Sequence, residues 1–450
     1  MQLTATKHKL LMAAALSVTA PVFAVDLVGV HDLAVQNDPQ LRAAAYRRDS
    51  TGEFKRQAWS NLLPSLSGSV SYNKGDSDVS VGGTLISESD VDTENYSLNL
   101  RQSLYAQSNY ERLDVARGQV SQAGAIYKLA YQDFLLRVAG GYFAVLTAKD
   151  GVIFAEAEEK ALQRQFEQAE QRFEVGLTAV TDVHEARASY DNARARAIVS
   201  RNNLADANEA LFELTRQYFA DVDPLQEVLP LVKPVPDNQA EWVDIAMQHN
   251  PSVITAQLGV EIADANMRLQ RSGHFPTLDL VASTSRFTNN EFLIRDDFQR
   301  PIGTVPLSVV DMRIGLQLSV PIYQGGVVLS RTRQARYTLN AVNEDLDRQQ
   351  RAVVRQTNNA YRAVIAGIEQ VGAFGQALIS AASALEATQA GFEVGTRTIV
   401  DVLIAQQRYF QAQRDNSRAR HTYIVDHLRL KAAAGLLAEG DLHKINSILK

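Results

Sequence analysis

The sequence predicts a mainly helical protein whose chain also contributes four transmembrane β-strands. Three observations indicate this fold class. The 450 residues divide into two tandem copies of one pattern. Each copy contains a pair of segments in which apolar and polar residues alternate, as they do in strands that face lipid on one side. Each copy also contains a long proline-free stretch, which favours uninterrupted helices.

The first residues have the features of a secretory signal peptide. Lys7 and Lys9 precede an apolar stretch over 10–23, and small residues suited to signal-peptidase cleavage end at Ala24. An uncleaved membrane anchor is the alternative, although the stretch is short and contains Pro21. We therefore expect residues 1–24 to be removed on export.

Composition excludes several classes of protein. The net charge is -6 with no basic cluster, which argues against nucleic acid as a partner. The chain has no cysteine, so it has no disulfide, thiolate metal site, cysteine nucleophile or lipid-modified N-terminal cysteine. After residue 24 we find no run of about 18 apolar residues and expect no transmembrane helix, which leaves β-strands to cross a bilayer.

Matched motifs define the two copies. Pro39 and Pro64 lie 25 residues apart, as do Pro251 and Pro276. Phe-Glu-Val-Gly at 173–176 recurs at an offset of 219, and so does a following Asp-Val pair. Matches in register indicate duplication. We expect a signal peptide over 1–24, a first repeat over 25–230, a Pro-rich linker over 231–248, a second repeat over 249–433 and a tail over 434–450.

Each copy has the same predicted order of elements. An Ala-rich helix begins at a proline, where the missing N–H has no cost. Two strands follow, and the Gly-, Ser-, Asp- or Pro-rich segments between the paired strands are predicted to be exposed loops. The predicted helices cover 39–61 and 251–273, the strands 66–72, 96–100, 278–280 and 312–320, and the loops 73–95 and 287–311.

The remainder of each copy is predicted to be two long helices joined by a tight turn. A helix over 106–172 would be on the order of 100 Å long at about 1.5 Å per residue. Gly176 and Gly395 interrupt the two helical stretches, and glycine accommodates the positive φ that commonly ends a helix. We expect a helical hairpin in each copy.

Four strands per chain can span a bilayer, but a closed barrel needs about eight or more. Two chains would fill the barrel interior with side chains, whereas three chains would leave a lumen. A soluble half-buried sheet and a structural coiled-coil spacer are the alternatives. A soluble sheet would leave the signal peptide and the long helices unexplained. A coiled-coil spacer would leave the alternating strands without a purpose.

The two turns resemble those of the TolC family of outer-membrane factors. The resemblance lies in Phe173-Glu-Val-Gly-Leu-Thr-Ala-Val-Thr-Asp182-Val and Val394-Gly-Thr-Arg397-Thr-Ile-Val-Asp401-Val-Leu403, and it extends over the mature chain. It implies a homotrimer with a 12-stranded barrel in the outer-membrane lipid of a Gram-negative bacterium and a periplasmic α-barrel of coiled helices. It also implies a channel that exports drugs or proteins. In this function the channel would work with two partners, a periplasmic adaptor and an inner-membrane RND or ABC transporter.

The resemblance places a constriction at the second turn. Asp401 matches a constricting aspartate, and Arg397 matches an arginine that joins helix pairs through Thr181 and Asp182. Three symmetry-related Asp401 carboxylates would attract cations. On pattern alone, Asp401 and Arg397 could equally be solvated residues at a helix start.

Two positions depart from the family pattern. Ile404 stands where the family has a second aspartate, and Phe392 stands where it has a tyrosine. Glu185 is the first-copy equivalent of Ile404. We hypothesise that Asp401, together with Glu185, sets cation selectivity while Ile404 forms a drier constriction.

The turn residues are the predicted docking tips for the adaptor, although a purely structural helix cap would also account for the glycines. They are Val175, Gly176, Leu177, Val394, Gly395 and Thr396.

Two other functions are weighed against the channel. A periplasmic enzyme would require a catalytic motif, and we find no Walker loop, His-Glu-x-x-His or Gly-x-Ser-x-Gly. The eight histidines are dispersed, so we predict no metal site and no cofactor. A stand-alone porin would require eight or more strands per chain and little helix.

Overall fold

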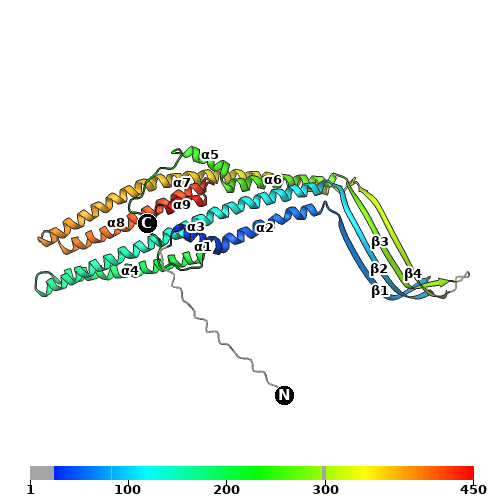
Figure 1. Cartoon of the computed structure of the whole chain (residues 1–450), viewed down its shortest axis with the longest axis horizontal. Helices are drawn as coiled ribbons and strands as arrows, with labels where there is room; N and C mark the ends of the chain where they lie inside the picture. Colours follow the sequence, from blue (N-terminus) through cyan, green and yellow to red (C-terminus); the bar gives the residue numbers. More distant parts are fainter. Residues whose placement is uncertain (1–24, 83, 296–300) are drawn as a thin grey trace, which may run out of the picture.

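The computed structural model describes residues 25–82, 84–295 and 301–450. The predicted signal peptide lies outside these residues. A β-sheet forms one end of an elongated molecule, and two helical hairpins form the other end (Figure 1).

The two repeats have the same order of elements, apart from a short 3-10 turn in the second. The first repeat contains α1 (Leu27–Asn37), α2 (Pro39–Ser60), β1 (Ser65–Val81), β2 (Thr84–Ala106), α3 (Gln107–Glu174) and α4 (Val180–Thr215). The second contains α5 (Gln239–His249), α6 (Pro251–Arg271), the 3-10 turn η1 (Ser272–His274), β3 (Thr277–Arg295), β4 (Pro301–Ser319), α7 (Val327–Glu393) and α8 (Ile399–Ala433). Helix α9 (Glu439–Asn446) follows. Helices α1, α5 and α9 were not predicted from the sequence. Helix α5 lies largely in the segment predicted as linker, and α9 lies in the predicted tail.

Equivalent caps begin α2 and α6. The Asp38 carboxylate accepts hydrogen bonds from the backbone N–H groups of Gln40 and Leu41 at 3.2 and 3.1 Å. In the second repeat, the Asn250 side chain accepts from the N–H of Ser252 at 2.8 Å. A proline occupies the first turn of each helix. The cap and the proline together fix where each helix begins.

The four strands form one antiparallel sheet in the order β1-β2-β3-β4. The predicted loops over 73–95 and 287–311 were wrong, because paired strand occupies most of both segments, up to Val81 and from Thr84 in the first hairpin and up to Arg295 and from Pro301 in the second. Polar side chains do not prevent strand pairing when both faces of a hairpin are in water, since the backbone ladder satisfies the main chain. Composition alone therefore predicted the apolar part of each strand and missed the polar part next to the hairpin turn.

The predicted alternation of strand faces is confirmed. Val70 lies opposite Tyr96, and Leu66 lies opposite Leu100. One face exposes large apolar side chains: Leu66, Val70, Leu98, Met312, Ile314 and Leu316. The interleaved residues are small or polar: Ser67, Ser69, Asn99, Ser283 and Ser285. One face of the sheet therefore suits lipid and the other suits water.

The main core lies where α1, α3, α8 and α9 meet. Phe134 and Tyr142 of α3 are fully buried there, together with Leu428 of α8 and Leu442 of α9. The Tyr142 hydroxyl donates a hydrogen bond to the carbonyl of Asp223 at 2.8 Å. The core therefore packs the middle of the long helix α3 against α1 and α9.

Helices α3 and α7 each contain an 18-residue window with mean hydropathy 1.3, so by length and composition both could cross a membrane. The expectation that no such helix exists was therefore too strict. At 68 and 67 residues, both are far longer than one membrane span. In α3, Leu135 and Val138 belong to the main core, which gives its apolar content a packing role.

Candidate functional site

The two hairpin turns lie at the same end of the molecule, opposite the sheet (Figure 1). Gly176 has φ +76° and Gly395 has φ +80°. In the first turn the N–H of Leu177 donates to the carbonyl of Arg172 at 2.8 Å, and in the second the N–H of Thr396 donates to the carbonyl of Gly391 at the same distance. This is the hydrogen-bonding pattern of a glycine-terminated helix. The two predicted turns are confirmed.

The turns present apolar side chains to solvent. Val175 is 68% exposed, Leu177 75% and Val394 76%. Thr396 stands beside them and donates its hydroxyl to the carbonyl of Gly391 at 3.0 Å. A cluster of exposed apolar side chains indicates a surface that contacts a partner more often than a single exposed apolar side chain does.

Asp401 caps the helix that follows the second turn. Its Oδ2 accepts hydrogen bonds from the N–H and the hydroxyl of Thr398, both at 2.9 Å, and its own N–H donates to the Thr398 hydroxyl at 3.3 Å. These bonds, with the nearby charge of Arg397, hold the pKa of Asp401 below its usual range. The carboxylate is therefore ionised at neutral pH and also serves as part of a capping box.

The structure does not bring Arg397 and Asp182 together within one chain. The Asp182 carboxylate accepts a hydrogen bond from the hydroxyl of Thr178, in its own turn. Thr181 and Arg397 are exposed, and in the part of the chain described here Arg397 forms no ion pair with Asp182.

Other contacts connect the two hairpins. The Arg172 guanidinium lies 4.7 Å from the centre of the Phe392 ring, which joins the end of α3 to the end of α7. Beneath this pair, Ile399 and Leu403 of α8 pack in one apolar cluster with Leu162 of α3 and residues of α4. Sequence reasoning singled out Phe392 but missed the other contact residues. Only the four-residue spacing of Ile399 and Leu403 hinted at this face.

With the geometry of the turns established, we compared the chain with known proteins. Residues 30–215 and 242–436 match the family model described as outer membrane efflux protein. The chain belongs to this family. The two matched segments coincide with the two repeats, and the chain is accordingly an outer-membrane protein of the kind found in Gram-negative bacteria.

Curated relatives and a solved structure support the assignment. The chain is 37% identical over 442 residues to the outer membrane protein TolC of Vibrio cholerae, covering 98% of each chain. It is 28% identical to the alkaline protease secretion protein AprF of Pseudomonas aeruginosa, covering 94% of this chain and 87% of AprF. The crystal structure of the outer membrane protein VceC of Vibrio cholerae superposes with a TM-score of 0.74 at 18% identity, covering 91% of this chain and 96% of VceC. The fold is that of outer-membrane channels.

In this member of the efflux family, the candidate constriction residues lie on open helix faces. Asp401 and Ile404 are three residues apart on α8 and share a face. Ile404 is 43% exposed, whereas Val402 and Leu403 are buried. Glu185 is likewise exposed on α4, on the turn after Asp182.

A buried charge cluster joins the hairpins further from the turns. Glu158 of α3 is fully buried. Its carboxylate forms ion pairs with the guanidinium groups of Arg196 of α4 at 2.8 Å and Arg414 of α8 at 2.9 Å. Both arginines are partly exposed. Glu158 therefore links three helices of the two hairpins. Sequence reasoning missed it because the three residues come from distant parts of the chain.

Proposed function

We propose that this protein is a trimeric exit duct, not an enzyme, that carries drugs or proteins across the outer membrane. A periplasmic adaptor and an inner-membrane RND or ABC transporter dock at its helical tips. The observation that carries the proposal is the separation of two surfaces: a lipid-compatible sheet at one end and two exposed apolar turns at the other (Figure 1).

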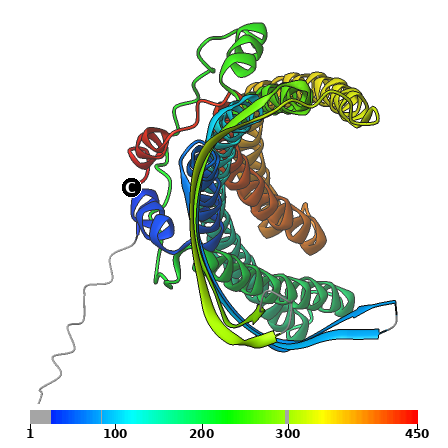
Figure 2. The same ribbon diagram turned by 90° about the vertical axis from the view of Figure 1, so that its right-hand side faces the viewer.

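The shape of one chain supports a trimer. Strands β1 and β4 are the edges of the sheet and have no neighbour strand within the chain in the residues described. In a bilayer such edges must pair with other strands. Sheet and helices together follow one open arc (Figure 2). Three copies would close a twelve-stranded barrel with a lumen, whereas a stand-alone porin would need more strands in each chain.

Within the trimer, we place the gate at the hairpin turns. Asp401 carboxylates from three chains would surround the axis and favour cations, with Glu185 adding negative charge. Ile404 would narrow the same passage with apolar surface. Arg397 would reach Thr181 and Asp182 of a neighbouring chain, since it is exposed and unpaired with them in its own chain. Opening requires these contacts to separate.

In this proposal, the transporter that docks with the duct determines the cargo, and this chain does not. The relatives include TolC, an outer membrane protein, and AprF, a protease secretion protein. We therefore propose service in multidrug efflux, type I secretion or both, with the adaptor selecting the transporter.

A photo-crosslinking residue at Leu177 tests the docking proposal. Irradiation of living cells should capture a periplasmic adaptor on a trimeric protein, and mass spectrometry of the captured protein would distinguish an efflux adaptor from a secretion adaptor. The same residue at Met312, which is 85% exposed on the apolar sheet face, is the matched control and should capture no adaptor. Capture of nothing but this protein, migrating as a monomer, would refute both the duct and the tip assignment.

A further inference from the structure

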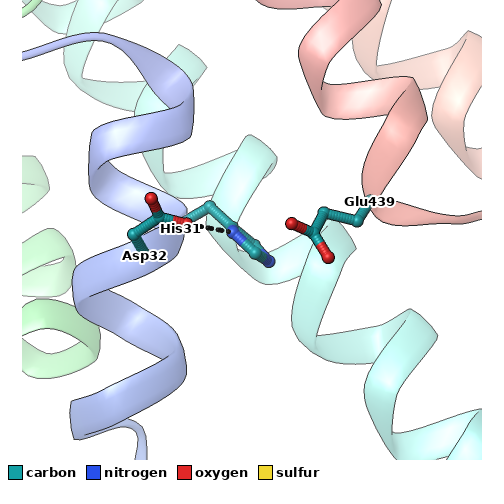
Figure 3. A group of neighbouring side chains, drawn as sticks. All are labelled: His31, Asp32 and Glu439. Atoms are coloured by element: carbon teal, nitrogen blue, oxygen red, sulfur yellow. Dashed lines mark hydrogen bonds and ion pairs between the residues drawn. The ribbon is translucent and has the colours of Figure 1, made fainter.

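Three side chains from the two ends of the chain converge beside the main core. His31 and Asp32 belong to α1, and Glu439 is the first residue of α9. A ligating atom from each lies within 4.8 Å of the others. Figure 3 shows the Glu439 carboxylate facing the imidazole ring from the side opposite Asp32. No sequence motif could reveal this group, because about 400 residues separate its members.

The state of His31 points to a ligand. Its side chain is almost completely buried, and its Nδ1 lies 3.1 Å from Asp32 Oδ1. When Nδ1–H donates to this carboxylate, Nε2 carries a free lone pair. Among the described residues Nε2 is buried without a hydrogen-bond partner. A carboxylate that orients an imidazole in this way is the usual arrangement behind a metal-ligating histidine.

The charge around His31 favours a cation. Asp32 and Glu439 have no Lys or Arg partner in the described part of the chain; their ion-pair contacts are to His31 and to His443. The site therefore combines two carboxylates that lack a Lys or Arg partner with a buried ring nitrogen that has no hydrogen-bond partner among the described residues.

We propose that His31 Nε2 and the Glu439 carboxylate bind a zinc-class divalent cation that fastens α9 to α1, while Asp32 orients the imidazole from its Nδ1 side. Imidazole nitrogen with carboxylate oxygen is a ligand set that suits Zn²⁺. His443 lies one helical turn after Glu439, with its Nε2 3.9 Å from the Glu439 carboxylate. In the proposed site, a change in its side-chain rotamer would bring this exposed imidazole to the ion as a third ligand.

The duplication supplies an internal comparison. At the offset of 212 that relates α1 to α5, His31 corresponds to Val243 and Asp32 to Asp244. The second repeat thus keeps the carboxylate and lacks the imidazole. Asp244 is exposed, so Asp244→Asn removes an equivalent charge without touching the proposed site.

Zinc titration of the purified full-length trimer tests the proposal. The protein, carrying no histidine tag, is stripped with a chelator and titrated with Zn²⁺ in a calorimeter. We expect one Zn²⁺ per chain and a higher unfolding temperature with Zn²⁺ present. Asp32→Asn and Glu439→Gln should each weaken binding by about 10- to 100-fold, and His31→Gln should abolish it. Asp244→Asn should bind as the parent does.

Two results would overturn the site. One is a parent protein that takes up no stoichiometric Zn²⁺. The other is Glu439→Gln binding Zn²⁺ as tightly as the parent. Glu439 is exposed at the start of a short terminal helix, so this variant folds and remains decisive even where His31→Gln disturbs the core.

Discussion

Asp401 has two separable roles at the second turn. Its carboxylate completes the capping box with Thr398, and in the proposed trimer its charge would face the passage. Asp401 is the third residue of the helix and accepts from the Thr398 N–H, so Asp401→Asn removes the charge while its amide oxygen can still accept that bond. We expect this variant to lose cation preference in planar bilayers, seen as a shift of the reversal potential towards zero in a salt gradient. An unchanged reversal potential would exclude Asp401 from the selectivity filter.

The direction of the Asp401 pKa shift predicts the pH dependence of selectivity. Hydrogen bonds from Thr398, and the Arg397 charge, lower the pKa in the folded protein. A lowered carboxyl pKa means that the ionised form, and its contribution to the helix cap, persists below the usual aspartate range of about 3.9 and is lost only as the pH falls through the folded-state value. Cation preference should therefore be equal at pH 7 and pH 5. A loss between these values would assign selectivity to a weaker acid.

Phe392, which stands where the family has a tyrosine, forms a cation–π contact. Its ring lies under the Arg172 guanidinium. An exposed cation–π pair contributes about 0.5–1 kcal/mol, which is roughly a two- to fivefold change in an equilibrium. We expect Arg172→Gln to raise the open probability of single channels by about that factor. Arg172→Lys, which keeps the cation, is the control. Equal open probabilities in the parent and both variants would show that the pair does not bias the gate.

At the scale of the elements, local signals in the sequence were sufficient for some features and not for others. Gly176 and Gly395 marked the turns correctly, because a positive φ is a property of one residue. The absence of proline correctly indicated the long helices. The ends of β1 and β3 were missed, since strand pairing in a hairpin depends on the partner strand and not on the polarity of its own residues. Helices α1, α5 and α9 were missed because they are short.

The contacts that join the hairpins could not be predicted from the sequence for a different reason. Glu158, Arg196 and Arg414 lie on three helices, and no local pattern shows that they meet. The same holds for His31 and Glu439. The resemblance to a family identified turn residues by motif, yet it could not supply contacts specific to this chain, such as Arg172 on Phe392.

The buried Glu158 cluster predicts a measurable stability difference between two glutamates that are two residues apart on α3. Glu158→Ala should lower the free energy of unfolding by about 1–3 kcal/mol, because it leaves two charged donors without their acceptor. The loss should stay below the roughly 3–5 kcal/mol of a fully buried pair, since both arginines reach solvent.

The control for this prediction is Glu156→Ala. Glu156 pairs with Arg201 at 2.8 Å, and both side chains are about half exposed. An exposed pair of this kind contributes up to about 1 kcal/mol. Denaturant unfolding of the trimer in detergent compares the two variants. Equal losses would show that Glu158 is no more important to the helical bundle than a surface ion pair.

At the scale of the whole molecule, the fold separates membrane attachment from the candidate gate. The sheet occupies one end, the hairpin turns the other, and helices on the order of 100 Å long connect them. The main core and the candidate zinc site lie between these ends, where α1 packs against α9. Substitutions in the sheet should therefore affect insertion and leave the gate contacts unaltered.

Adjacent residues of β1 provide the sharpest test of how the whole molecule sits in the membrane. Val70 is 72% exposed on the apolar face, whereas the Ser69 hydroxyl lies on the opposite face, 2.8 Å from that of Ser97. An arginine facing lipid costs about 2–4 kcal/mol near the bilayer midplane, and one facing a water-filled lumen costs little. Val70→Arg should therefore reduce the amount of assembled trimer in outer-membrane fractions, while Ser69→Arg should assemble normally and alter conductance. Equal assembly of both variants would mean that the alternating faces of this sheet do not separate lipid from lumen.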